Sequence, residues 1–161
     1  MDELSFRKAG RDDISKILFF IEKIAEYEKM SEQMRKDPEM LEREIFDKKR
    51  AEVLFLIVNG EEIGFALYFF NFSTFENHSG LYLEDIFILE EYRHRGYGKK
   101  TFSKLCQIAM ENGCRRMEWV CLKWNVPSLN FYHSLSAKRM DEDWATLRLN
   151  VDDIKRIAEE K

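Results

Sequence analysis

A basic turn that contains two glycines is the first place where this chain could do chemistry. It reads Arg-His-Arg-Gly-Tyr-Gly-Lys-Lys over residues 93–100 and lies between a predicted strand and a predicted helix. Glycines let a backbone approach an anion closely, and the free N–H groups at the start of a helix favour a pyrophosphate. A surface turn with solvated charges explains the two glycines about equally well. The spacing matches neither a dinucleotide-binding fingerprint nor a P-loop, which disfavours both classes.

Two adjacent carboxylates, Glu84 and Asp85, interrupt the apolar run that precedes this turn. Neighbouring residues of a strand point to opposite faces, so both cannot face water if the sheet is covered on both sides. A carboxylate buried without partners is costly, and its perturbed pKa suits base chemistry. The alternative is that one of the two lies at a strand end or pairs with an arginine.

Hydrophobic spacing and turn signals predict the elements that position these groups. Apolar residues recur at helical spacing between residues 14 and 25, and Asn59-Gly60 predicts a hairpin. Further helices are predicted at 37–47, from the basic turn to Gly113, at 127–132 and at 152–160. Strands are predicted at 4–7, 53–58, 63–72, 81–89, 117–122 and 144–149, with a polar loop at 71–80. This order predicts one mixed α/β domain over residues 1–161.

Composition bounds the class of protein. The 161 residues are 45% hydrophobic, enough for the core of one domain, and the net charge of -4 argues weakly against nucleic acid and for a cationic ligand. Three cysteines without a C-x-x-C pair favour reduced thiols in a cytoplasm over a disulfide framework. The three histidines have no metal-binding spacing, and we expect no metal site. We also expect no signal peptide and no membrane span, because the N-terminus lacks a basic and an apolar region and no run of about 18 apolar residues occurs.

The basic turn resembles the acetyl-CoA pyrophosphate turn of the GNAT superfamily of N-acetyltransferases. Arg93, Gly96 and Gly98 match the fixed positions of its R-x-x-G-x-G pattern. The resemblance implies a single-domain GNAT fold, with a mixed, mostly antiparallel central sheet flanked by helices. It also implies acetyl-CoA as co-substrate.

Three further segments resemble the diamine/polyamine branch of that superfamily, which includes spermidine/spermine and thialysine acetyltransferases. They are Asn-Phe-Ser-Thr-Phe at 71–75, Tyr-Leu-Glu-Asp at 82–85 and Trp-Asn-Val-Pro-Ser-Leu-Asn-Phe-Tyr at 124–132. The resemblance implies direct acetyl transfer to a primary amine of a small diamine, polyamine or thialysine-like acceptor. It also implies a homodimer, a small-molecule amine as partner, and neither nucleic acid nor membrane.

The resemblance also implies roles for individual residues. Glu84 is the expected base, acting through water, and Tyr132 is the expected acid, because a phenol of pKa about 10 can protonate a departing thiolate. The residues expected to contact the cofactor are Ile86, Phe87, Ile88, Arg93, His94, Arg95, Gly96, Tyr97, Gly98, Lys99 and Asn125. The residues expected around the acceptor amine are Tyr27, Glu28, Asp85, Glu142 and Trp144.

The chain departs from the family pattern at several positions. Relatives usually have glycine where Ser136 and Asp143 stand, and many have glycine where His94 stands. Ser73 replaces an acid of the spermidine/spermine type, which favours shorter lysine-like or diamine acceptors. Two alternatives stay open: a protein or peptide acetyltransferase on the same fold, and a non-catalytic acyl-CoA-binding module. The second is disfavoured because a pure binder needs neither Glu84 nor Tyr132.

Overall fold

The computed structural model describes residues 3–160, which divide into two compact units. The first ends at Val120 and holds the sheet, and the second begins at Cys121. The prediction of one domain over residues 1–161 stays a prediction.

The first unit contains a five-stranded sheet in the order β1-β2-β3-β4-β5. Four strands follow one another antiparallel, and the fifth is parallel to β4 over three residue pairs. The mixed, mostly antiparallel sheet predicted from the family resemblance is therefore confirmed. The strands are β1 (Leu4–Lys8), β2 (Glu52–Val58), β3 (Glu61–Ser73), β4 (His78–Ile88) and β5 (Arg116–Glu118).

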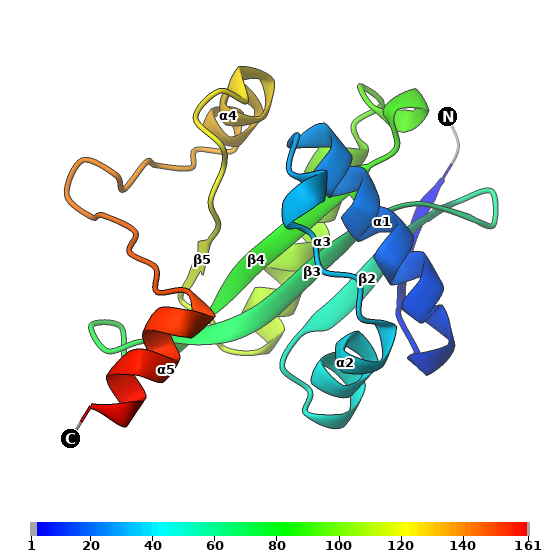
Figure 1. Cartoon of the computed structure of the whole chain (residues 1–161). Helices are drawn as coiled ribbons and strands as arrows, with labels where there is room; N and C mark the ends of the chain where they lie inside the picture. The colour runs from blue at the N-terminus through cyan, green and yellow to red at the C-terminus, as the bar shows by residue number, and fades with distance from the viewer. Residues whose placement is uncertain (1–2, 161) are drawn as a thin grey trace. The chain divides into compact units, whose positions relative to one another are not determined.

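Helices of the first unit cover both faces of this sheet. In Figure 1, α1 (Ile14–Tyr27) crosses in front of the strands and α3 (Tyr97–Glu111) lies behind them. Between α1 and β2 the chain forms α2 (Pro38–Glu42), which continues as the π-helical η3 (Arg43–Asp47). Short 3-10 turns precede, follow or connect these elements at η1 (Arg11–Asp13), η2 (Ser31–Gln33) and η4 (Glu90–Tyr92).

Two apolar clusters explain why these helices bind the sheet. The buried face of α1, with Ile17 and Phe20, packs on Phe55 and Phe65 of the central strands. On the opposite face, Tyr97 at the start of α3 packs with Leu56, Val58 and Ile63 of β2 and β3. Burial of one large apolar side chain stabilises a fold by about 1.5–3 kcal/mol, so the two clusters hold the sheet between its helices.

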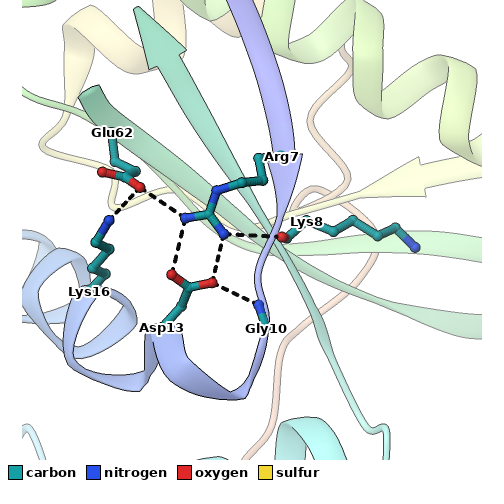
Figure 2. A network of polar contacts seen from close by, with 6 residues as sticks. All are labelled: Arg7, Lys8, Gly10, Asp13, Lys16 and Glu62. Carbon is teal, nitrogen blue, oxygen red and sulfur yellow. Dashed lines mark hydrogen bonds and ion pairs between the residues drawn. The ribbon is translucent and has the colours of Figure 1, made fainter. Parts of the chain in front are cut away.

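A network of charged side chains joins the start of α1 to the sheet (Figure 2). The guanidinium of Arg7 on β1 pairs with Asp13, through Nη1 and Oδ2 at 2.7 Å, and with Glu62 on β3, through Nη2 and Oε1 at 2.9 Å. Lys16 of α1 makes a second ion pair with Glu62, and Asp13 also accepts the Gly10 N–H. The network therefore links β1, the start of α1 and β3.

The second unit contains two helices, α4 (Val126–Ser134) and α5 (Val151–Glu159). Asn125 caps α4 by accepting the Ser128 N–H, and Asn150 caps α5 by accepting the N–H groups of Asp152 and Asp153. Asparagine is among the best residues for this position. No helix among residues 3–160 is both long and apolar enough to cross a membrane.

Three of the predicted elements differ from the structure. The strand predicted at 144–149 is wrong: this segment is irregular, and Trp144 and Leu147 are exposed, because a strand needs a paired neighbour that the segment does not have within the described residues. The strand predicted at 117–122 is shortened to β5. The polar loop predicted at 71–80 is mostly strand, because β3 runs to Ser73 and β4 resumes at His78.

Candidate active site

Glu84 lies in a β-bulge of strand β4. Leu67 of β3 pairs with Asp85 and the next residue, Tyr68, pairs with Leu83, so Glu84 has no partner on β3. A bulge breaks the strict alternation of side chains and re-aims the residues around it. The prediction that Glu84 and Asp85 face opposite sides of the sheet assumed a regular strand, and the bulge removes that assumption. Glu84 is exposed and Asp85 is half-buried.

Glu28, at the C-terminal end of α1, joins these two residues in one acidic cluster. Burial raises the pKa of Asp85 to about 7, and the charges of Glu84 and Glu28 contribute to this shift. Burial, followed by the charge of Glu84, also raises the pKa of Glu28. None of the three carboxylates has an ion pair with a cation among residues 3–160, so the alternative of an arginine partner is not realised. A bound cation would relieve this repulsion.

Strand β4 has a free edge beside this cluster. β5 accompanies β4 only from Gly80 to Tyr82, so the backbone of residues 83–88 has no strand neighbour on that side within the first unit. The Leu89 N–H donates to Ile63 O on β3, at 2.9 Å. Because the peptide is planar and trans, the Ile88 carbonyl points the other way, to the free edge. By alternation, Ile86 and Ile88 present their N–H and C=O groups there, and Phe87 presents its own to β3.

The basic turn follows this edge and leads into α3. Gly96 is the N-cap of α3 and has the left-handed conformation, with φ of 79°. No side chain caps α3, so the N–H groups of its first turn remain for an external acceptor, which suits an anion. His94 also has a positive φ, of 61°. The side chain of Tyr97 is buried in the core, so only its backbone is exposed to a ligand of the turn.

The side chain of Arg93 turns away from the start of α3. Its Nε donates to Ile88 O at 2.8 Å, and its Cζ lies 5.2 Å from the ring centroid of Tyr27 and 5.1 Å from that of Phe87. Tyr27 is the last residue of α1 and precedes Glu28. Arg93 thus contacts the end of α1, the end of β4 and the basic turn.

Tyr82 is a residue near the acidic cluster that the sequence did not single out. Its ring stacks on Phe69, with centroids 5.0 Å apart, and its pKa is raised by burial, then by the charges of Glu84 and Glu118. A tyrosine in an apolar strand has the same sequence signal as any core aromatic, so only the structure identifies it.

Comparison with known proteins identifies the chain. Residues 18–136 match the family model described as Acetyltransferase (GNAT) family. The chain belongs to the GNAT family of acetyltransferases. It is 32% identical over 165 residues to a thialysine N-epsilon-acetyltransferase of Bos taurus, covering 94% of this chain and 95% of that one. Over 94 residues it is 38% identical to an L-ornithine N5-acetyltransferase of Arabidopsis thaliana, covering 58% of this chain and 41% of that one.

Solved structures agree on the fold. An integron cassette protein from the mobile metagenome of V. cholerae has a TM-score of 0.80 at 20% identity, with 98% of each chain covered. The predictions of the family, the fold and an acyltransferase are confirmed. The chain is a GNAT enzyme that transfers an acetyl group to an amine, and the family uses acetyl-CoA as co-substrate.

The remaining predicted residues of this GNAT enzyme lie in the second unit. Asn125 is buried, and its Oδ1 accepts the Ser128 N–H at 3.4 Å. Tyr132 lies half-buried in α4, with its ring 5.6 Å from that of Phe131. Glu142 and Trp144 are exposed. The acidic cluster, the free edge of β4 and the basic turn are all in the first unit.

The family departures have a structural explanation at two positions. Ser136, where relatives usually have glycine, ends α4 with φ of 66°. Its N–H donates to His133 O and the next N–H donates to Tyr132 O, which is the hydrogen-bond pattern of a left-handed helix end. His94 likewise holds a conformation that favours glycine.

Proposed function

We propose that this GNAT enzyme acetylates a primary amine of a small diamine, polyamine or thialysine-like molecule, by direct transfer from acetyl-CoA. The observation that carries the proposal is the acidic cluster of Glu28, Glu84 and Asp85, which has no cation partner among residues 3–160 and adjoins the free edge of β4. Two relatives are named for their acceptors, thialysine and L-ornithine, and these names agree with an amine acceptor that carries further charged groups.

The residues of the first unit fit the co-substrate at two places. The N–H and C=O groups of Ile86 and the N–H of Ile88, which face the free edge, suit the amides of a pantetheine arm, which would add to β4 as a strand does. The uncapped start of α3, with Gly96 and Gly98, suits the pyrophosphate. His94, Arg95 and Lys99 complete this turn. The backbone of Arg93 and Tyr97 and the side chain of Asn125 belong to the same proposed set. Phe87, predicted from the family resemblance, is left out of it because its backbone groups face β3.

The acceptor would bind at the acidic cluster. Asp85 and Glu28 would hold a distal ammonium, since two carboxylates with raised pKa values gain most from a nearby cation. Tyr27, Glu142 and Trp144 are also proposed to contact the acceptor. Ser73, which replaces an acid of the spermidine/spermine type, is buried and accepts the Glu76 N–H in the β3–β4 turn. The lack of an acid there favours short acceptors over long polyamines.

The chemical steps follow from the protonation states. An alkylamine of pKa about 10 is mostly protonated at neutral pH, so Glu84, through water, would take its proton. The thioester of acetyl-CoA supplies the acetyl group. Backbone N–H groups on the free edge of β4 would donate to the thioester carbonyl as the amine nitrogen attacks. The carbon–sulfur bond then breaks, and Tyr132 would donate its proton to the leaving sulfur. The surplus proton of the new amide nitrogen would return through water to the Tyr132 phenolate.

The test is a ranking of kcat/KM for thialysine, lysine, putrescine, spermidine and a peptide with a free amine, all with acetyl-CoA. We expect lysine-like and diamine acceptors to lead. A peptide that exceeds them tenfold, about 1.4 kcal/mol in the transition state, would replace this proposal with a protein acetyltransferase. Binding of CoA without turnover of any amine would indicate an acyl-CoA-binding module instead.

The family resemblance also suggests a homodimer and a cytoplasmic location for this enzyme, and both stay predictions. Light scattering after gel filtration measures the first. Fractionation of cells that express the tagged chain measures the second.

A further inference from the structure

The basic turn contains two arginines whose side chains have different surroundings. Arg95 makes only local contacts: its Nη2 donates to Glu91 O at 2.8 Å and its Cζ lies 5.4 Å from the ring centroid of Tyr92. Arg93 reaches α1, which is distant in the chain, through Tyr27, and the end of β4 through Phe87. Both arginines lie in the same turn, but only the Arg93 side chain contacts α1 and β4.

The hydrogen bond of Arg93 closes the free edge of β4. The Ile88 carbonyl points to this edge, because the following N–H, that of Leu89, donates to β3 on the other side. Arg93 Nε donates to that carbonyl at 2.8 Å. Arg93 therefore already donates to the Ile88 carbonyl, the last hydrogen-bond acceptor that β4 would offer to a strand-like ligand.

The aromatic contacts of Arg93 fix the end of α1. Tyr27 closes the helix, and the backbone N–H groups that follow it, those of Glu28, Lys29 and Met30, bond back to Ile24, Glu26 and Ala25. Glu28 is the member of the acidic cluster that this segment supplies. A guanidinium that holds Tyr27 against Phe87 therefore also sets where Glu28 stands relative to β4.

We propose that Arg93 is a positioning residue, which holds the C-terminal end of α1 and the Ile88 carbonyl of β4 in register with the basic turn, and that its side chain does not bind the cofactor phosphates. The assignment of the two binding sites rests on the proposed function. A guanidinium suits this role because its plane can lie against rings while Nε donates a hydrogen bond. A lysine keeps the charge and loses both the plane and the Nε donor.

The first experiment compares Arg93→Lys with Arg115→Lys, a control that makes the same change at an exposed arginine outside the proposed sites, where Nε donates to Glu76 Oε2 at 2.9 Å. We measure kcat/KM for the best amine at saturating acetyl-CoA, and the Kd of CoA by calorimetry. We expect Arg93→Lys to lower kcat/KM for the amine about tenfold or more, the size of one lost stacking and hydrogen-bonding group. The Kd of CoA should stay within about threefold, and Arg115→Lys should change neither quantity by more than that. Unchanged amine kinetics, or a tenfold weaker CoA complex, would overturn the proposal.

A double-mutant cycle tests whether Arg93 acts through Tyr27. Tyr27→Leu removes the ring that the guanidinium contacts and should resemble Arg93→Lys. The double variant Arg93→Lys/Tyr27→Leu should lose no more than the larger single loss, because both changes break one contact. Losses that multiply would mean that the two residues act independently, and the proposal would be wrong. If Arg93→Lys does not fold, Tyr27→Leu decides alone: wild-type kinetics in this variant would overturn the role of the contact.

A readout without turnover separates this inference from the proposed function. Hydrogen exchange of the backbone amides at residues 28–30 reports directly on the end of α1. We expect exchange there to be at least about tenfold faster in Arg93→Lys than in Arg115→Lys or wild type. Equal exchange in the three proteins would overturn the positioning role even if the amine is acetylated. Faster exchange in a protein that acetylates no small amine would support the role of Arg93 while the proposed acceptor fails.

Discussion

The backbone of Gly64 passes against the carbonyl of Phe87, so closely that a Cβ on Gly64 would lie 2.3 Å from that oxygen. Gly64 faces Ile88 in the β3–β4 pairing, opposite the free edge. Any larger residue must push β4 outward at the place where the cofactor is proposed to bind.

Gly64→Ala should therefore reduce both stability and activity. Because the obstacle is backbone and not a flexible side chain, we expect a loss of about 1–3 kcal/mol in the free energy of unfolding, as in other overpacked sites. Urea denaturation measures it, and calorimetry with CoA should detect weaker binding. Gly60→Ala is the control: Gly60 has open space around it but a φ of 82°, so it tests backbone strain without a clash. A Gly64→Ala variant with wild-type stability would contradict the close approach.

Asp85→Asn should stabilise the protein at high pH. The pKa of Asp85 is raised from 3.8 to about 7, mainly by burial, so its ionisation costs the folded state free energy. This cost is absent below about pH 4, grows as the pH rises through the window from 4 to 7, and is complete above 7. We expect Asp85→Asn to gain on the order of 1–3 kcal/mol at pH 8 and little at pH 4.

Urea denaturation of Asp85→Asn at several pH values measures this gain, with Asp143→Asn in an exposed segment as the control. The same variant should lose kcat/KM for the amine if Asp85 holds a distal ammonium. A stability gain that does not depend on pH would contradict the raised pKa.

Asp13→Asn should have the opposite pH dependence. The hydrogen bond from Arg7 lowers the pKa of Asp13, and that from Lys16 lowers the pKa of Glu62 in the same network. A lowered pKa stabilises the fold above the ordinary value near 4, and this stability is lost as the pH falls through the lowered value. We expect Asp13→Asn to lower the free energy of unfolding by about 0.5–1.5 kcal/mol at pH 7. Below pH 4 this free energy should depend less on pH in the variant than in the wild type.

Thermal or urea denaturation between pH 2 and 7 gives this comparison. The control is Asp153→Asn, which breaks the more exposed ion pair with Arg156 on α5 and should change stability by less than about 0.5 kcal/mol. Equal losses in the two variants would mean that the Arg7 network contributes no more than an ordinary surface pair.

Tyr132→Phe removes one proton and keeps the ring. If Tyr132 protonates the leaving sulfur, kcat should fall about a hundredfold or more while the Kd of CoA changes little. Steady-state kinetics and calorimetry separate the two quantities. A kcat within twofold of wild type would make Tyr132 a structural residue of α4.

Ser136→Gly should stabilise the end of α4. Ser136 has φ of 66°, a conformation that costs a residue with a side chain about 1 kcal/mol or more. Glycine removes this cost, but it also makes the unfolded chain more flexible, which offsets part of the stabilisation. We expect a net gain of about 0.5 kcal/mol, visible as a higher Tm. Ser103→Gly, in the interior of α3, should lower stability by about 0.5–1 kcal/mol and serves as the control. A lower Tm for Ser136→Gly would mean that the serine side chain contributes contacts of its own.

Local patterns in the sequence determined most of the elements and the outline of the site. Helical spacing predicted α1, Asn59-Gly60 predicted the β2–β3 hairpin, and the basic turn was recognised as the start of α3 because glycines and a helix N-terminus are local features. The adjacency of Glu84 and Asp85 likewise marked an unusual strand, because two carboxylates within an apolar run are visible in the sequence itself.

Tertiary structure alone decided the features that depend on pairing between distant segments. The bulge at Glu84 is a shift of one residue against β3, which alternation along a single strand cannot reveal. The segment 144–149 has the pattern of a strand, but a strand exists only with a partner, and none pairs with it among the described residues. Arg93 looked like one more cation of an anion-binding turn, and only the packing of α1 against β4 brought it to Tyr27 and Ile88. Sequence determines which groups are available, and long-range packing determines which of them meet.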